Sequence, residues 1–167
     1  MSALEFVTYG RPAPKGSKQH GGAGQFYEQS RYLPAWMDAV ILAAQRARIA
    51  AKWRTATMPC VLDLVFSLDR AEHQSPDTPW LDDYPAKPPD LDKLARGVAD
   101  ALTRAGVWAD DALWVGCDRL YKVYAGRPET WPIITGSEYL HTKRRAIDGW
   151  TGAWVKVTQL SELENNV

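Results

Sequence analysis

The segment after the Pro88-Pro89 dipeptide constrains the fold most strongly, because its apolar residues recur at helical spacing. One helical face is formed by Leu91, Leu94, Val98 and Leu102. The pattern predicts a helix over residues 91–104, and Gly106 is a suitable C-terminal cap for it. A helix with one apolar face needs a second apolar surface to cover it, so the rest of the chain must supply that surface.

The remaining periodicities predict one more helix and a small sheet. A wide apolar stripe runs from residue 33 to 51 and consists of Leu33, Trp36, Met37, Val40, Ile41, Ala44 and Ala51. Alternation predicts four strands, at residues 4–9, 61–68, 115–124 and 153–158. Residues 10–24 break regular structure, and loops are expected at about 70–86 and 125–152. We therefore expect one α+β domain over residues 1–167, with a mixed sheet of about four strands packed against two main helices.

Composition excludes several classes of protein. The 20 basic residues balance the 20 acidic ones, which argues against indiscriminate coating of nucleic acid but leaves room for a local basic face. No apolar run approaches the roughly 20 residues that span a bilayer, and the N-terminus does not resemble a signal peptide. We expect a cytoplasmic protein without a membrane partner, whose two cysteines, Cys60 and Cys117, are reduced and buried.

Two pairs of aspartates flank the predicted helix. Asp90 and Asp92 open it, and Asp110 and Asp111 follow its end. Carboxylate oxygens are the ligands that Mg²⁺ prefers, and this ion usually takes one or two protein carboxylates beside water and phosphate. The helix is about 20 Å long, and the six residues 105–110 could just span that distance if the chain turned back. Spacing alone leaves a metal site and ordinary structural roles equally open.

Those structural roles are specific. Asp90 stands where a helix N-cap is expected, and Asp92 complements the helix dipole in the first turn. Asp110 and Asp111 could form a polar turn. Arg96 lies midway between Asp92 and Asp100 on one helical face, so these three could form a charge ladder. The alternative for Arg96 is a position beside the metal, where a guanidinium could hold a phosphate in a bidentate manner.

At these residues the chain resembles the RusA family of Holliday-junction resolvases. The family opens a helix with Asp-x-Asp-Asn-x-x-Lys, and the matching stretch here is Asp90-Leu91-Asp92-Lys93-Leu94-Ala95-Arg96. The family's later motifs follow in order as Asp100-Ala101-Leu102, Asp110-Asp111 and the strand lysine Lys122. Residues 10–16 also match the family's Gly-x-Pro-x-Pro-Lys-Gly. The similarity covers roughly residues 4–125.

The resemblance implies a homodimer that nicks four-way DNA junctions with Mg²⁺, for which Mn²⁺ is a substitute, in a bacterial cell or a phage-infected host. The family's metal-binding aspartates correspond to Asp90, Asp92 and Asp111, with Asp110 as a further ligand or a residue that orients one. Arg96 and Lys122 are expected to stabilise the negative transition state. The basic residues expected to contact DNA are Arg11, Lys15, Lys18, Lys122, Lys143, Arg144 and Arg145.

Two departures from the family pattern leave other functions open. Lys93 replaces the family's asparagine, and Arg96 replaces its lysine. Arginine keeps the positive charge but cannot act as a proton donor, because it stays charged at any working pH. The first alternative is a catalytically weakened or silent junction-binding protein on the same scaffold. The second is a nuclease that prefers other branched DNA, such as flaps or replication forks.

Overall fold

The computed structural model describes residues 2–16, 19–21, 25–27, 30–69, 85–125 and 150–160. Most of the two predicted loops, and the basic residues Lys18, Lys143, Arg144 and Arg145, therefore lie outside the described residues. The elements in chain order are β1 (Ser2–Tyr9), β2 (Gln19–Gly21), β3 (Gln25–Tyr27), α1 (Leu33–Ala51), β4 (Cys60–Leu68), α2 (Leu91–Arg104), the 3₁₀ turn η2 (Asp111–Leu113), β5 (Trp114–Gly116), β6 (Leu120–Tyr124) and β7 (Gly152–Gln159).

A mixed five-stranded sheet forms the centre of the molecule. Strand β7 lies between β1 and β4 and is antiparallel to both. Strands β5 and β6 pair in parallel with the same side of β4, β5 at its beginning and β6 at its end. The mixed sheet and the two helices confirm the predicted α+β fold.

The segment predicted as one strand over residues 115–124 is two strands, β5 and β6. Between them, the backbone amides of Asp118 and Arg119 donate hydrogen bonds to Oδ1 of Asp63, at 2.8 and 2.9 Å. Asp63 lies on β4 and is buried, so its carboxylate needs these donors. A buried acceptor on the neighbouring strand thus shapes the turn, which local alternation could not reveal.

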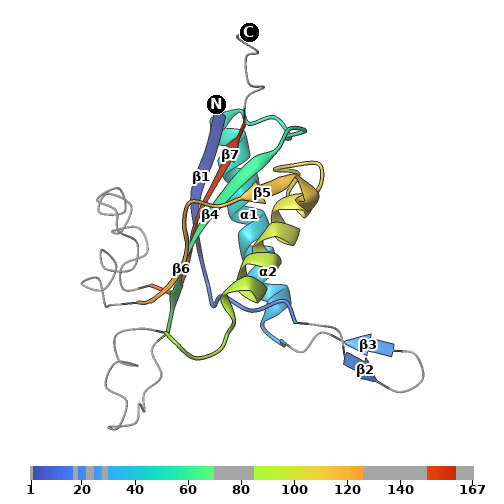
Figure 1. The fold of residues 1–167 in the computed structure, drawn as a ribbon, viewed down its shortest axis with the longest axis vertical. Coiled ribbons are helices and arrows are strands. Elements are labelled where there is room, and N and C mark those ends of the chain that lie inside the picture. The colour runs from blue at the N-terminus through green and yellow to red at the C-terminus, as the bar shows by residue number, and fades with distance from the viewer. Residues whose placement is uncertain are drawn as a thin grey trace.

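Both helices cover the same face of the sheet (Figure 1). The predicted stripes face the sheet: Trp36 and Val40 of α1, and Leu94, Val98 and Leu102 of α2, are almost completely buried. Ala51, which the sequence placed on the stripe, is exposed. The opposite face of the sheet carries a smaller cluster of Val65, Val123 and Trp154.

The C-terminal end of α2 is closed by the predicted cap. Gly106 has a φ of +70°, and its amide donates to the Thr103 carbonyl at 2.9 Å. The amide of Val107 donates to the Leu102 carbonyl, which completes the pattern of a helix that ends in a left-handed glycine. Arg48 of α1 donates to the carbonyl of Ala105 and so satisfies another acceptor at this end.

Three smaller expectations have mixed outcomes. The glycine-rich stretch expected to be irregular contains the antiparallel pair β2–β3. Both cysteines are free, as expected, but Cys117 is exposed and only Cys60 is buried. Burial raises the pKa of the Cys60 thiol. Within the described ranges, neither helix combines the length and the hydrophobicity needed to cross a bilayer.

Candidate functional site

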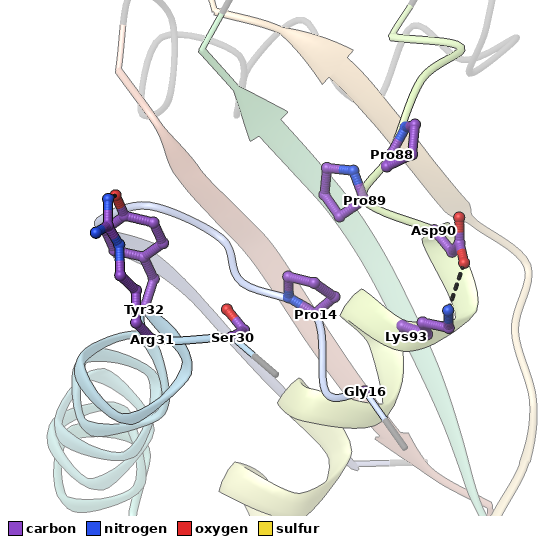
Figure 2. Close-up of a pocket in the computed structure, with 9 residues that line it drawn as sticks. All are labelled: Pro14, Gly16, Ser30, Arg31, Tyr32, Pro88, Pro89, Asp90 and Lys93. Carbon is purple, nitrogen blue, oxygen red and sulfur yellow. Dashed lines mark hydrogen bonds and ion pairs between the residues drawn. The ribbon is translucent and has the colours of Figure 1, made fainter. Parts of the chain in front are cut away.

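Asp90 occupies the N-cap position of α2, but its side chain does not act as a cap. Its backbone is extended, at φ −67° and ψ 138°, and its carbonyl accepts the first helical hydrogen bond from Leu94 at 3.1 Å. Its carboxylate turns toward Lys93, and Oδ2 lies 2.8 Å from Nζ (Figure 2). The N-cap explanation therefore accounts for the backbone of Asp90 and not for its carboxylate, which is half exposed.

The charges at this end of α2 act on one another. The hydrogen bond and the charge of Lys93 lower the pKa of Asp90, and the charge of Lys122 adds to the effect. In return, the hydrogen bond and charge of Asp90 raise the pKa of Lys93, with a further contribution from the charge of Asp92. A lysine ammonium thus interacts with both carboxylates of the Asp90-Leu91-Asp92 motif.

Lys122 of β6 holds the segment that leads into α2. Its Nζ donates to the carbonyls of Lys87 and Pro89, at 2.9 and 3.0 Å. Burial lowers the pKa of Lys122, and the charge of Asp90 opposes that shift. Sequence reasoning expected this lysine to contact DNA or the transition state, whereas the structure shows it bound to the backbone just before Asp90.

The segment 11–16 lies along α2, and Lys15, one of the predicted DNA contacts, holds it there. Lys15 forms an ion pair with Asp100, and its amide donates to the Lys93 carbonyl at 3.0 Å. The predicted ladder through Asp92, Arg96 and Asp100 is therefore wrong, because Asp100 is paired with Lys15. Among the described residues, Asp92 and Arg96 take part in no ion pair.

Asp110 and Asp111 lie beyond the other end of α2. Oδ1 of Asp110 accepts a hydrogen bond from the amide of Ala112 at 2.8 Å, so this carboxylate caps η2. Asp111 is exposed at the first position of η2. Trp108, two residues before Asp110, is buried and donates to Thr103 Oγ1 at 2.8 Å.

Asp111 does not come back to the start of the helix. Strand β5, which follows η2, pairs at Cys60, whereas Lys122 pairs opposite Phe66, six residues further along β4. Six strand residues and the length of α2 both correspond to about 20 Å. The expectation that the acidic residues meet within one chain is wrong, because residues 105–110 turn toward the bridge between Ala56 and Trp108 and not back along the helix (Figure 1).

The start of α2 carries two of the carboxylates that were predicted to bind a metal ion. In the part of the chain that the structure describes, no three His, Cys, Asp or Glu side chains gather closely enough to hold a metal ion. Asp90 and Asp92 nevertheless offer two carboxylates around an ammonium group, which is the number that Mg²⁺ commonly takes from a protein. These residues fit one side of a Mg²⁺ site, and the other ligands must come from elsewhere.

A groove of about 530 Å³ opens beside Asp90. Figure 2 shows Asp90 and Lys93 on one side of it and Arg31 and Tyr32 on the other, with Pro14 and Gly16 between them. Sequence reasoning missed Arg31 and Tyr32. The available sequence signal was an arginine and a tyrosine directly before α1. Their proximity to Arg11 is visible only in the structure.

Comparison with known protein families assigns the chain to one of them. The family model described as Endodeoxyribonuclease RusA matches residues 7–131, a range that includes all four flanking aspartates and Lys122. The chain belongs to the RusA family of endodeoxyribonucleases. Membership implies a nuclease that resolves Holliday junctions and binds branched DNA. A search of curated proteins found no match.

Proposed function

We propose that this protein is a metal-dependent endodeoxyribonuclease that resolves four-way DNA junctions by paired symmetric nicks. The observation that carries the proposal is the family match over a chain whose Asp90 carboxylate faces an open groove instead of capping its helix. The carboxylate of a buried or capping aspartate would already be bonded to other groups of the folded protein. A half-exposed one at the edge of a groove is accessible to a cation and a phosphate.

The separation of the aspartates supports a homodimer with shared sites. Asp90 and Asp92 lie about 20 Å from Asp111 in one chain, because β5, which follows Asp111, pairs six residues away from Lys122 along β4. A two-fold axis that sets two α2 helices side by side and antiparallel brings the start of one helix next to the end of the other. Each site would then combine Asp90 and Asp92 of one chain with Asp111 of the second copy, and two such sites suit a four-way junction.

The chain's own residues have separable roles in this proposal. Bound Mg²⁺, or Mn²⁺ in its place, would activate water and neutralise charge on the scissile phosphate. Arg96 is exposed one helical turn after Asp92, where its guanidinium can hold a phosphate oxygen and stabilise developing charge. Lys122 acts indirectly, because it holds the backbone carbonyls just before Asp90 and so positions that residue.

DNA would be bound chiefly through its phosphates, with junction shape selecting the substrate. Among the described candidates, Arg11 forms no ion pair with another described residue, whereas Lys15 is held by Asp100 and Lys122 donates to backbone carbonyls. Lys18, Lys143, Arg144 and Arg145 remain proposed contacts. Binding should weaken steeply as salt rises if several phosphates are neutralised.

The test is a cleavage assay with a labelled four-way junction and the matching linear duplex. Wild-type protein should nick the junction symmetrically with Mg²⁺ or Mn²⁺ and should not do so with a chelator. Asp92→Asn should lose cutting while it retains junction binding, because only a ligand carboxylate is removed. Undiminished cutting by Asp92→Asn would contradict the assignment.

One observation favours a second candidate, a junction-binding protein with weak or no nuclease activity. Lys93 replaces the family's asparagine, and its ammonium already interacts with the carboxylates that would hold the metal. In that case wild-type protein should bind the junction in chelator and leave it intact with every divalent ion. Flaps and replication forks in the same assay would reveal a different branched substrate.

A further inference from the structure

The groove beside Asp90 has a second charged end, which the catalytic proposal does not use. Pro14, Pro88 and Pro89 line the groove between its two ends, and none of these side chains carries a charge. Asp90 and Lys93 stand at one end, and Arg31 and Tyr32 stand at the other (Figure 2).

Two guanidinium groups share the Tyr32 ring. The Cζ atom of Arg11 lies 4.1 Å from the ring centroid, and that of Arg31 lies 4.7 Å from it. Arg31 also donates a hydrogen bond to the Tyr32 hydroxyl. We call these three residues the arginine–tyrosine cluster. The ring orders two long side chains that would otherwise move independently in solvent, which reduces the entropy lost when they bind an anion.

The cluster concentrates positive charge that nothing described nearby neutralises. Within the described ranges, neither Arg11 nor Arg31 forms an ion pair with a carboxylate. The hydrogen bond and charge of Arg31, together with the charge of Arg11, lower the pKa of Tyr32. Planar guanidinium groups in this arrangement offer several N–H donors to a bidentate anion such as a phosphodiester.

We propose that the arginine–tyrosine cluster binds a backbone phosphate of the DNA strand that runs through this groove, away from the phosphate that is cut. The inference rests on the proposed function and adds a strand path to it. Uncharged proline rings between the two ends suit the sugars of that strand. The guanidinium groups at one end suit a phosphate, whereas the Asp90 carboxylate at the other end would need a bound cation to accept one. The cluster would set where the strand lies before the reacting phosphate meets Asp90 and Asp92, because phosphate contacts determine register.

The experiment measures junction binding in chelator, so that cutting does not enter the result. A set of four-way junctions is prepared, each with one backbone phosphate replaced by an uncharged methylphosphonate. At one position beside the scissile phosphate, the replacement should weaken binding to wild-type protein about tenfold, the scale of a lost charge-assisted hydrogen bond. The Arg11→Gln/Arg31→Gln double variant should bind the junction with that replacement about as tightly as the unmodified junction. In this variant, the phosphate at that position has already lost its protein partner.

Salt dependence and matched variants complete the test. The double variant should reduce the slope of log affinity against log salt by about 1, the change expected for one lost phosphate contact. Arg46→Gln, which removes an equally exposed arginine from α1, should change neither affinity nor slope. Tyr32→Phe should retain the ring and most of the affinity, whereas Tyr32→Leu should behave like the double variant.

The outcomes separate this proposal from the nuclease proposal. Wild-type affinity and slope in the double variant, or a methylphosphonate effect that persists in it, would overturn the role of the cluster. Thermal melting of each variant checks that folding is intact, and Tyr32→Phe provides a variant with minimal change. If a variant lost cutting but gave these same binding results, the nuclease proposal for Asp90 and Asp92 would be affected. The role of the cluster would not be.

Discussion

The two ends of helix α2 are built in opposite ways. At the C-terminal end, Gly106 takes a left-handed conformation, Arg48 donates to the Ala105 carbonyl, and the Trp108 indole is buried. At the N-terminal end, the Asp90 carboxylate is half exposed, and it pairs with Lys93 instead of capping the helix. One end satisfies its polar groups within the fold, and the other leaves charged groups at a groove.

Under the proposed function, this difference separates stability from chemistry along one helix. A helix that is fixed firmly at one end and against the sheet can leave carboxylates at its other end partly unsatisfied. Substitutions in the C-terminal cap, at Gly106, Arg48 or Trp108, should therefore change mainly the free energy of unfolding. Those at the N-terminal end should change mainly metal binding and cutting.

The largest expected effect comes from mixing two inactive variants, one from each end. Asp92→Asn and Asp111→Asn should each lose on the order of 10²-fold or more in junction cutting, because each removes a carboxylate proposed to hold the metal ion that would stabilise the transition state. Mixed and re-equilibrated, they should recover roughly a quarter of wild-type activity, since half the dimers would carry one intact shared site of two.

The control for this experiment is each variant re-equilibrated alone, which should stay inactive. Recovery requires that Asp92 and Asp111 of one site come from different chains. A mixture that stays as inactive as its components, although mass spectrometry detects the mixed dimer, would contradict the shared site.

Gly106→Ala should be the most damaging of the stability changes. The added Cβ would lie 2.7 Å from Arg48 Nη1, in a backbone conformation that L residues rarely adopt. A loss of about 1–2 kcal/mol in the free energy of unfolding is expected from the conformation alone. Urea unfolding measures it, and Gly116→Ala is the matched control because its Cβ would meet nothing within 4 Å. Equal stability of both variants would show that the cap is unimportant.

Lys122→Met tests whether the N-terminal end of α2 also depends on hydrogen bonds from the rest of the fold. Methionine keeps the side-chain stem but loses both hydrogen bonds to the carbonyls of Lys87 and Pro89. We expect a loss of about 1 kcal/mol in stability and about tenfold in the rate of cutting, because small displacements of reacting groups are costly. Single-turnover rates and urea unfolding separate the two. If the single-turnover rate of cutting were unchanged when the protein is saturated with junction, Lys122 would have no positioning role.

Lys93→Asn should have the smallest effect, and in the opposite direction. Removing the ammonium frees the Asp90 carboxylate and raises its pKa back toward the usual range. The Mg²⁺ concentration that half-saturates cutting should fall by about two- to fivefold, since exposed ion pairs are weak. Calorimetric Mg²⁺ titration gives a readout independent of activity, and Lys87→Asn is a control for loss of a nearby exposed lysine. An unchanged or higher Mg²⁺ requirement would show that Lys93 does not compete with the metal.

Local pattern predicted most of the elements because periodicity and caps depend on near neighbours. The helix over residues 91–104, its glycine cap and the burial of Trp36 were all predicted from spacing alone. The division of residues 115–124 into β5 and β6 was not, because Asp63, which holds the turn, lies more than 50 residues earlier. The pairing of Lys15 with Asp100 was missed for the same reason.

The sequence by itself determined the α+β class and the two helices, because these follow from periodicity. Its ordered motifs also singled out the aspartates that are proposed to carry the chemistry. Only the tertiary structure decided which of those residues meet. It separated Asp111 from Asp90 by about the length of α2, and it brought Arg11 beside Arg31 and Tyr32. Distances between segments depend on how the sheet and helices pack, and no local pattern of residues contains that information.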